Sequence, residues 1–584
     1  MPRIAVVNRD LFNPYESELM VNLCPVNRKG EPCITISPLD KKINIDEKMC
    51  IGCGICVNRS TPGSIHIINL PDELASKPIH RYGQNGFHLY NLPVPLFGKV
   101  VGILGRNGIG KSTALKILSG QFMPNLGGTT EATYDDLISY FKGSEAQDYL
   151  ERLKNKTIRV SYKPQQVDLI PKATKGTVRQ LLERVDEKGQ FAQIVKILDL
   201  EHVLDNDVSK VSGGELQRVA IAATVLRKAD VYFFDEPSSY LDIKQRLNVS
   251  RFIRDLADEK TAVMVVEHDL IILDYMTEMI YLLYGKEGVY GICSKIKSTR
   301  NGINIYLSGF LRDENMRFRD KAITFKERAE ARRGESTVQV SWTGIKKKLG
   351  RFSLESAFGS IHRKDIIGIL GENGTGKTSF VKILAGVDKP DAGEIDTSIK
   401  VSYKPQYLDS SSDELVENVL QDAIAKHNTQ VVEPLGLTFL FTRKINELSG
   451  GELQRVAIAI CLAKEADVYL LDEPSAYLDV EQRLIVSKLI RDFMDLRGKS
   501  CMVVDHDLLF LDYLSEKLMV FEGQPAIFGM ATGPFPMGEG MTRFLTELAL
   551  TFRRDPDSGR PRINKEGSVL DREQKSSKKY YYTA

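Results

Sequence analysis

The chain has 584 residues, of which 42 % are hydrophobic and 27 % are charged, so a wholly disordered or fibrous protein is excluded. That length predicts roughly three to five domains. The formal net charge is only +2, so any contact with a polyanion must come from local patches rather than from a global field. No run of about eighteen apolar residues occurs, and the N-terminus lacks an apolar signal core. We therefore expect no membrane span, no secretion and a cytoplasmic location.

The N-terminal region is rich in cysteine and is expected to hold a metal cluster. Without an export signal, clustered cysteines indicate metal ligands before disulfides. Three of them have the spacing C-x2-C-x2-C with glycines between, and Cys24 precedes a proline, as at the end of an upstream ferredoxin motif. We expect one [4Fe–4S] cluster, with zinc as the alternative metal, on Cys24, Cys50, Cys53 and Cys56. Cys33 lies nearby and is not assigned as a ligand.

A glycine loop follows the next apolar run, at residues 99–104, and has the spacing G-x4-G-K-[ST]. Such a loop lets backbone N–H groups surround phosphate oxygens at the start of a helix. Lys111 would then reach the β- and γ-phosphates, and Ser112 would bind Mg²⁺. The ATP-binding residues expected here are Gly105, Asn107, Gly108, Gly110, Lys111, Ser112 and Thr113.

Residues 134–156 form an insert with apolar residues at helical spacing on both sides of Gly143. This pattern predicts a helix–turn–helix whose second helix starts with a capping box of Ser144 and Gln147. The insert is either a surface insertion without a role of its own or, through its basic residues, a docking surface.

Five motifs then recur in the same order, which shows that the chain contains two copies of one domain. Lys111 and Lys377 lie 266 residues apart. The repeated segments are 105–113 and 371–379, 162–165 and 403–406, 212–222 and 449–459, 233–242 and 470–479, and 267–269 and 505–507. Apolar strand patterns alternate with helical ones around each copy, which indicates an α/β fold with a mostly parallel sheet. The second glycine loop supplies Gly371, Asn373, Gly374, Gly376, Lys377, Thr378 and Ser379.

Paired acids end one buried strand in each copy and indicate ATP hydrolysis. Asp235 and Asp472 are placed to hold Mg²⁺, while Glu236 and Glu473 point elsewhere and can act as general bases on the attacking water. His268 and His506 end the next strand and are expected to contact the γ-phosphate or to polarise the water. Gln165 and Gln406 would sense Mg²⁺ and that water.

The paired SGGELQR segments resemble the signature of ATP-binding-cassette (ABC) ATPases, whose two nucleotide domains pack head to tail. The resemblance implies two composite sites. One site would combine residues 105–113, Gln165, Asp235, Glu236 and His268 with Ser449, Gly450, Gly451 and Glu452. The other would combine residues 371–379, Gln406, Asp472, Glu473 and His506 with Ser212, Gly213, Gly214 and Glu215. In this family an aromatic residue stacks on adenine; the candidates are Tyr82 and Phe87 for the first site and Trp342 for the second.

The chain as a whole resembles the ribosome-recycling ABC proteins also called RNase L inhibitors. This resemblance rests on the cysteine motif and on segments outside the ATP motifs, namely 69–71 with 80–82, 302–310, 533–545 and 553–564. The head departs from the family pattern, because Glu16, Met20, Ser60 and Thr61 stand where relatives carry a second set of cysteines and a Cys-Pro. We therefore expect the second cluster to be lost.

Two arginine-rich segments flank the second copy and correspond to the hinges of the family. Residues 292–333 carry 11 Lys/Arg against 5 Asp/Glu, and residues 553–584 carry 9 against 5. Arginine can grip carbonyls, carboxylates or RNA phosphates. The end of the chain, 572–584, is expected to be poorly ordered.

The expected organisation is a ferredoxin-like α+β domain (1–76), a first cassette (77–291), a hinge (292–333), a second cassette (334–528) and a second hinge with tail (529–584). By resemblance, the protein is an ATPase that splits ribosomal subunits after termination and stays on the small subunit into initiation. Its cofactors would be ATP, Mg²⁺ and one [4Fe–4S] cluster. Its partners would be small-subunit rRNA and proteins, a release factor or its relative, and initiation factors; it would be a monomer whose cassettes pair within the chain.

Three alternatives remain for the function. One is another twin-cassette ATPase that acts on the ribosome as a translation factor. The others are a soluble subunit of a membrane transporter and a DNA-repair ATPase; the metal head argues against the former, and the absence of a long heptad run argues against the latter.

Overall fold

The computed structural model describes residues 3–69, 77–319, 321–323, 325, 337–395, 400–406 and 410–581. Its contacts divide the chain into two compact units. The first unit contains residues 1–239, 251–267 and 276–320, and the second contains 240–250, 268–275 and 321–584. Two short segments of the first cassette thus pack with the second cassette. The domain limits expected at 76/77 and 333/334 fall outside the described residues.

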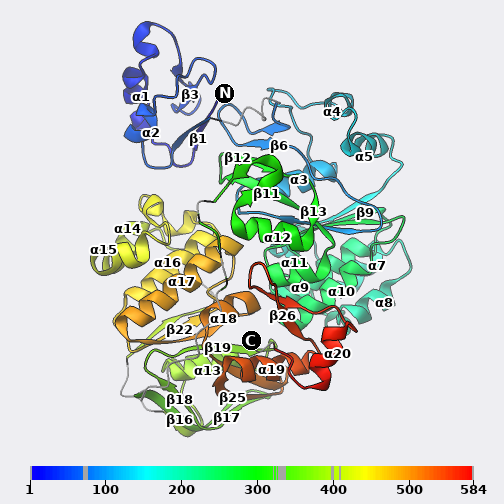
Figure 1. Ribbon diagram of the computed structural model, residues 1–584, viewed down its shortest axis with the longest axis vertical. Helices are drawn as coiled ribbons and strands as arrows, with labels where there is room; N and C mark the ends of the chain where they lie inside the picture. The colour runs from blue at the N-terminus through cyan, green and yellow to red at the C-terminus, as the bar shows by residue number, and fades with distance from the viewer. Residues whose placement is uncertain are drawn as a thin grey trace. The chain divides into compact units, whose positions relative to one another are not determined.

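The N-terminal head of the first unit is a small α+β fold built from two strand pairs and two helices (Figure 1). Its elements are β1 (Arg3–Val7), α1 (Ser17–Leu23), β2 (Ile34–Ile36), β3 (Ile43–Ile45), α2 (Ile55–Arg59) and β4 (Ile65–Asn69). β1 pairs antiparallel with β4, and β2 with β3. Their buried side chains and the cysteines form one small core.

The loop between strands β5 (His80–Arg81) and β6 (His88–Tyr90) of the first cassette makes hydrogen bonds to the head. Asn85, which is fully buried, donates from Nδ2 to the carbonyl oxygens of Ala5 (2.7 Å) and Ile45 (2.8 Å). Its Oδ1 accepts from the N–H of Ile45 at 2.8 Å. One side chain of the cassette therefore satisfies backbone groups from two strands of the head.

The first cassette contains a mixed sheet whose centre is parallel, as the apolar runs predict. The strand order is β5-β6-β12-β11-β7-β10-β9-β8, and β13 pairs with β11. All five residues of β7, β9 and β10 are buried, which is typical of parallel strands covered on both faces. The remaining strands are β7 (Val100–Leu104), β8 (Val160–Lys163), β9 (Val231–Asp235), β10 (Ala262–Val266), β11 (Met279–Lys286), β12 (Tyr290–Cys293), β13 (Lys297–Ser298), β14 (Phe310–Leu311) and β15 (Met316–Arg317).

The helices of this half include the two expected in the insert. They are α3 (Lys111–Leu118), α4 (Tyr134–Tyr140), α5 (Glu145–Lys154), α6 (Ile170–Ala173), α7 (Val178–Val185), α8 (Phe191–Ile197), α9 (Gly213–Val225), α10 (Ile243–Arg254), α11 (Leu270–Met276) and α12 (Thr299–Ser308). The predicted capping box at α5 is wrong, because Ser144 makes no side-chain cap and Gln147 accepts from the N–H of Gly143 instead. A capping box occurs at α4, between Thr133 and Asp136.

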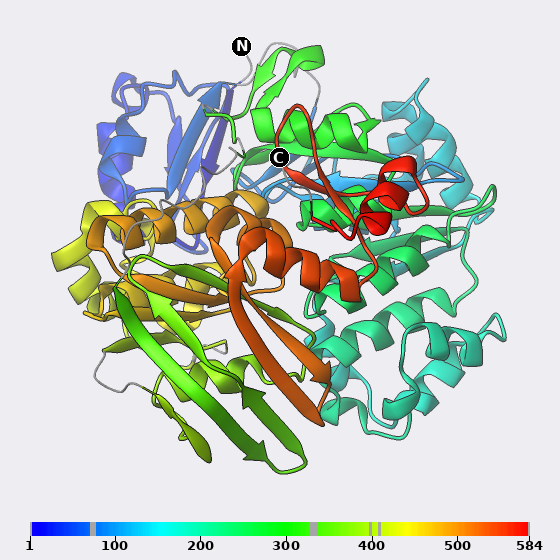
Figure 2. The same cartoon turned by 60° about the horizontal axis from the view of Figure 1, so that its bottom comes forward.

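The second unit repeats the cassette fold with an additional antiparallel layer. The strand order is β18-β16-β17-β25-β24-β19-β23-β22-β21, and β20 pairs with β16. In Figure 2 the long green strands β16–β18 and the orange pair β24–β25 curve around one side of this unit. The strands are β16 (Val338–Leu349), β17 (Phe352–Ser356), β18 (Gly359–His362), β19 (Ile366–Gly371), β20 (Ala392–Ile395), β21 (Val401–Lys404), β22 (Val468–Asp472), β23 (Ser500–Val504), β24 (Lys517–Gln524), β25 (Phe528–Pro536), β26 (Phe552–Arg554) and β27 (Pro561–Ile563). The helices are α13 (Lys377–Leu384), α14 (Val416–Val419), α15 (Gln421–His427), α16 (Gly450–Ala463), α17 (Val480–Arg497), α18 (Leu508–Leu514), α19 (Met537–Glu547) and α20 (Val569–Ser576).

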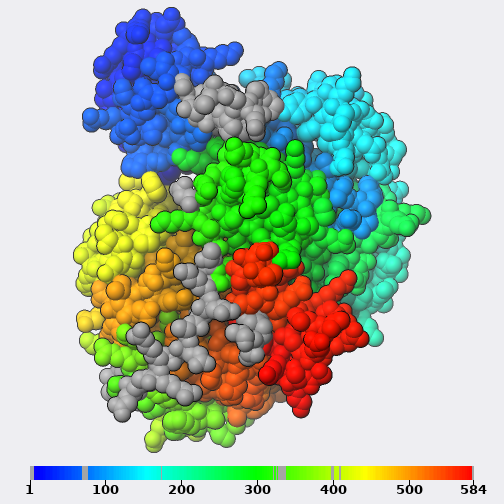
Figure 3. Space-filling model, viewed as in Figure 1, coloured from blue at the N-terminus to red at the C-terminus, as the bar shows by residue number. Residues whose placement is uncertain are grey.

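The C-terminal segment is folded as far as residue 581, which corrects the expectation of a poorly ordered tail. Helix α20 ends at Ser576, and beyond it the ring of Tyr581 is buried with its hydroxyl bonded to Asp512. Arg562 binds Asp274 through two nitrogens, at 2.6 and 3.1 Å. Figure 3 shows this red segment as a continuous packed patch next to the orange residues of the same unit. The last expected residues, 582–584, lie outside the described part.

Candidate nucleotide sites and the cysteine cavity

The two glycine loops have the same geometry, each between a buried parallel strand and a helix that begins at the loop lysine. Gly110 and Gly376 both have a φ of 92°, and a β-carbon at Gly376 would lie 2.9 Å from the Phe352 ring, so these positions require glycine. Lys111 Nζ donates to the carbonyl oxygens of residues 105 (2.9 Å) and 106 (2.6 Å). Lys377 Nζ does the same to residues 371 and 372, both at 2.8 Å. Burial lowers the pKa of Lys377 to about 8.

The acidic residues expected to hold Mg²⁺ lie at the ends of their strands with unsatisfied oxygens. Both carboxylate oxygens of Asp472 are buried without a hydrogen-bond partner, and so is Oδ1 of Asp235. Oδ2 of Asp235 accepts from the Tyr162 hydroxyl at 3.2 Å. Burial raises the pKa of both carboxyls above the usual value. The hydroxyls of Ser112 and Thr378 beside them act in the opposite direction and reduce this rise. Orphaned carboxylate oxygens next to a loop hydroxyl fit a hard divalent cation.

The glutamates that follow these acids are held by the predicted glutamines. Gln165 Nε2 donates to Glu236 Oε1 at 2.8 Å, and Gln406 Nε2 to Glu473 Oε1 at 2.7 Å. Each glutamine thus orients the carboxylate of its own cassette. Burial, followed by the charge of the preceding Asp472, raises the pKa of Glu473. A raised pKa suits a carboxylate that must accept a proton near neutral pH.

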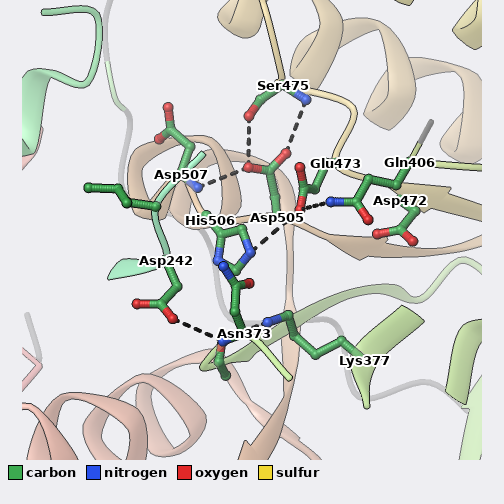
Figure 4. A network of polar contacts seen from close by, with 12 residues as sticks. Asp242, Asn373, Lys377, Gln406, Asp472, Glu473, Ser475, Asp505, His506 and Asp507 are labelled. Atoms are coloured by element: carbon green, nitrogen blue, oxygen red, sulfur yellow. Dashed lines mark hydrogen bonds and ion pairs between the residues drawn. The ribbon is translucent and has the colours of Figure 1, made fainter. Parts of the chain in front are cut away.

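His506 completes the cluster in the second unit (Figure 4). Its Nε2 lies 3.5 Å from Glu473 Oε1. Burial, then Lys377 and Arg246, lowers its pKa well below the usual range, so the ring is neutral. Asp505, in contact with Ser475, has its pKa raised to about 6 by burial. The histidine of the first copy, His268, is also buried and belongs to the second unit, whereas Glu236 belongs to the first.

The second glycine loop also receives an aspartate from the first sequence copy. Asp242 accepts from the backbone N–H of Asn373 at 2.9 Å, and Lys244 Nζ lies 2.7 Å from Glu372 Oε1. Residues 240–250 belong to the second unit, so these contacts lie within it. Asp242 was not among the expected site residues, although it ends the DEPSSYLD motif, which recurs as DEPSAYLD at 472–479.

Both signature serines cap the helix that follows them. Ser212 Oγ accepts from the N–H of Glu215, and Ser449 Oγ from that of Glu452. The glutamates in turn accept from the serine N–H groups, at 2.9 and 2.8 Å. Each helix, α9 and α16, therefore starts with glycine N–H groups in a rigid turn suited to binding an anion. The signature that starts at Ser212 lies in the first unit, and the one that starts at Ser449 lies in the second.

One of the three aromatic candidates for adenine stacking is corrected. Trp342 is only 1 % exposed, packs edge-on against Phe380 and donates from Nε1 to Ser356, so it belongs to the core and is closed to a nucleotide. Tyr82 is 47 % exposed and its hydroxyl lies 3.0 Å from that of Thr113. The counterpart of Phe87 in the second cassette is Phe352, because each ring lies against the equivalent glycine of its loop. The internal repeat could have revealed Phe352.

All five N-terminal cysteines line one small cavity of about 20 Å³. Its other walls are the apolar side chains of Val26, Ile34, Ile45, Ile51, Ile55 and Ile67. Cys33, which sequence analysis left unassigned, is buried there, and burial followed by the charges of Cys24 and Cys50 raises its pKa to about 12. Burial also raises the pKa of Cys56 to about 11.

The donor set of this cavity fits an iron–sulfur cluster. Among the described residues, no three His, Cys, Asp or Glu side chains converge as a single bound ion would require. A cubane distributes its cysteine ligands over different iron atoms, so it accepts a wider spacing. A cubane needs four cysteine ligands, and this cavity offers five thiols in apolar surroundings.

Comparisons with known proteins agree with the geometry. A protein-family model described as ABC transporter matches residues 96–239 and 354–476. The chain is 44 % identical to translation initiation factor RLI1 of Saccharomyces cerevisiae, over 99 % of this chain and 98 % of the relative. An uncharacterised ABC transporter ATP-binding protein of Methanocaldococcus jannaschii is 51 % identical over 99 % of this chain and 97 % of its own length.

Solved structures give the same result over 87–100 % of this chain. A chain described as RNase-L Inhibitor has a TM-score of 0.83 at 54 % identity, covering 87 % of this chain and 100 % of its own. A chain from a model of ribosome-bound archaeal Pelota and ABCE1 has a TM-score of 0.94 at 53 % identity, covering 100 % and 99 %. The chain belongs to the RNase L inhibitor (RLI1/ABCE1) family. As a member of this family with two ABC ATPase domains, it is an ATPase. None of the helices that the structure describes is both long and apolar enough to cross a membrane.

In this RNase L inhibitor family member, three of the head residues that sequence analysis compared with cysteine positions of the family make other contacts. Met20 is fully buried in the core of the head. The Glu16 carboxylate accepts from the N–H of Thr61 at 3.0 Å and from its hydroxyl at 2.9 Å. Met20 therefore belongs to the core of the head, and Glu16 and Thr61 form a closed polar pair.

Proposed function

We propose that this protein splits ribosomal subunits after termination by ATP-driven closure of its two cassettes, and then remains on the small subunit into initiation. The observation that supports it is a full-length match, at a TM-score of 0.94, to a structure described as ribosome-bound Pelota and ABCE1. The chain also keeps the loop lysine, the acid pair and the signature in both cassettes. An intact pair of sites is what a nucleotide-driven mechanical cycle requires.

Each ATP would be bound between the glycine loop of one cassette and the signature of the other. The serine and glycine groups that start α9 and α16 would then face the γ-phosphate of the opposite site. The contact of Asp242 with the backbone of Asn373 supports this arrangement, since it brings the end of one DEPSSYLD motif to the other glycine loop. Loss of the γ-phosphate on hydrolysis would remove the bridge and let the cassettes separate.

The residues of the second cassette have distinct tasks in hydrolysis. Lys377 would leave its loop carbonyls to bind the β- and γ-phosphates. Glu473, oriented by Gln406, would accept the proton of the attacking water, and neutral His506 would hydrogen-bond the γ-phosphate. Mg²⁺, held by Thr378 and Asp472 with Gln406 nearby, would supply charge neutralisation at the phosphates. The first cassette would use Lys111, Ser112, Gln165, Asp235, Glu236 and His268 in the same roles.

The head would carry one [4Fe–4S] cluster on Cys24, Cys50, Cys53 and Cys56, as a structural rather than a redox group. Its apolar cavity and the Glu16–Thr61 contact support one cluster rather than two. The head would contact a release factor or its relative. Helices α4 and α5, together with the hinges, would contact small-subunit rRNA mainly through phosphates. Such work would be done in the cytoplasm, by a monomer that would meet initiation factors on the small subunit.

The test is a subunit-splitting assay with purified ribosomes, followed on sucrose gradients. The full chain with ATP and its release-factor partner should convert intact ribosomes to subunits. The E236Q/E473Q variant should bind ATP and remain on the small subunit, but should not turn ATP over. If intact ribosomes are unaffected while ATP is hydrolysed at the usual rate, the proposed function is wrong.

A further inference from the structure

Both proposed general bases have a backbone conformation that is costly for glutamate. Glu236 and Glu473 each have a φ of 48°, in the left-handed region that side chains other than glycine and asparagine seldom adopt. The same value at both positions shows that the conformation is imposed by the fold. Such strain persists only where surrounding groups hold the residue in place.

In each cassette the glutamate carbonyl oxygen accepts from a buried lysine and a buried glutamine. Glu236 O accepts from Lys163 Nζ at 3.2 Å and from Gln217 Nε2 at 2.7 Å. In the second cassette, Glu473 O accepts from Lys404 Nζ at 3.4 Å and from Gln454 Nε2 at 2.5 Å. The lysines also donate to the carbonyl oxygens of the preceding aspartates, at 2.9 and 2.7 Å.

Packing alone does not account for these lysines. Lys163 is 0 % exposed and Lys404 is 1 % exposed, so each ammonium has been withdrawn from water. A buried charge is unfavourable unless it is well hydrogen-bonded, whereas methionine would fill the same space without that penalty. The ammonium is therefore explained by its hydrogen bonds to the backbone carbonyl oxygens of the Asp–Glu pair.

The lysine and the predicted glutamine belong to one short motif that binds the glutamate at both ends. In the sequence YKPQ, Lys404 holds the carbonyl of Glu473 while Gln406, two residues later, holds its carboxylate (Figure 4 shows the second of these contacts). Lys163 and Gln165 do the same for Glu236. The other donors, Gln217 and Gln454, come from the signature helices α9 and α16.

We propose that Lys163 with Gln217, and Lys404 with Gln454, are positioning residues that fix the backbone of the general-base glutamate and so direct its carboxylate at the attacking water. This inference rests on the proposed function, in which Glu236 and Glu473 are the general bases. It also ties each glutamate to the signature helix of its own cassette, whose first turn is proposed to serve the other ATP. A shift of that helix would move the glutamate through Gln217 or Gln454.

The test compares steady-state ATP hydrolysis and binding of a fluorescent ATP analogue in the full-length protein and its variants. K163M/K404M should lower kcat by roughly tenfold to a hundredfold, because a misplaced catalytic group loses rate steeply. Its KM and the analogue Kd should change by less than about twofold, because no proposed phosphate contact is removed. Q217L/Q454L should show the same separation of kcat from KM, and it decides the question if the lysine variant does not fold.

The matched control is S161A/S402A. These serines lie on the same strands two residues earlier, and each bonds a carbonyl of α9 or α16 at 2.8 Å. They do not bond the glutamates, so this variant should keep a kcat close to that of the wild type. If the serine and lysine variants lose kcat and binding together, the role is structural and the proposal is overturned.

The E236Q/E473Q variant separates the inference from the proposed function. If it hydrolyses ATP at the wild-type rate, the general-base assignment fails. If it is inactive while K163M/K404M or Q217L/Q454L keeps a wild-type kcat, the assignment stands and the positioning role is refuted.

Discussion

Replacing Asn85 by alanine should release the N-terminal head from the first cassette. Asn85 is 0 % exposed and its side chain makes three hydrogen bonds of 2.7–2.8 Å to the backbone of Ala5 and Ile45. Those backbone groups belong to the head, while Asn85 belongs to the cassette loop after β5. Alanine would leave them without these partners at a site from which water is excluded.

The expected cost follows from these contacts. Three hydrogen bonds at about 1 kcal/mol each, and the orphaned N–H of Ile45 at about 1–2 kcal/mol, give roughly 4–5 kcal/mol. Asn85 has a φ of 60°, where alanine costs about 1 kcal/mol more. Asn91 is the matched control, because its φ is 59° and it makes one long bond of 3.4 Å, to Cys293 O. N91A should therefore cost only about 1–2 kcal/mol.

The assay is native-state amide hydrogen exchange, because a protein of several domains does not unfold in one step. A difference of about 4 kcal/mol between the variants predicts that head amides, including that of Ile45, exchange roughly a thousandfold faster in N85A than in N91A. Equal exchange in the two variants would refute the argument that Asn85 secures the head.

Three further predictions follow from the structure. The purified protein should contain four iron atoms per chain. The C33S variant should contain about as many, whereas C24S and C53S should contain far fewer. If C33S and C24S lose iron equally, Cys33 is a ligand. Burial lowers the pKa values of His66, His80 and His88 to about 4. Between pH 6.5 and pH 4 the unfolded chain therefore binds more protons than the folded chain. The stability of the first unit should fall as the pH drops from about 6.5 to about 4. Exchange at pH 7 and pH 5 should show a smaller fall in H88Q than in the wild type, and an unchanged fall would contradict the assignment. Trp342 is the only tryptophan, so intrinsic fluorescence should be blue-shifted and unchanged by ATP, whereas quenching would restore it as a stacking residue.

Much of the site could be read from the sequence, because its parts are encoded in short contiguous motifs. A glycine loop, a capping serine or an acid at a strand end carries its chemistry within a few residues, and the duplication allowed each motif to be checked against a second copy. The parallel centre of both sheets followed from apolar runs such as 99–104 and 365–370, which suit strands buried on both faces. Family membership followed from segments outside the ATP motifs.

Errors arose where the direction of a side chain depends on distant neighbours. Trp342 was expected beside adenine, but the pairing of β16 with β17 and β18 turns its ring into the core and leaves Phe352 against the glycine loop. The last residues look like a charged tail, yet Tyr581 is buried and its hydroxyl donates to Asp512, which lies 69 positions earlier. Periodicity within a segment carries no information about such partners.

The sequence by itself determined the two nucleotide-binding motifs, whose chemistry is fixed by residue type and spacing, and the cysteine set of the head. Only the tertiary structure decided that Cys33 shares the cavity of the other cysteines, that Asp242 reaches Asn373, and that Lys163 and Lys404 bind the glutamate backbone. The physical reason is that buried charges and thiols are placed by hydrogen bonds between segments far apart in the chain, and those partners become known only once the chain is folded.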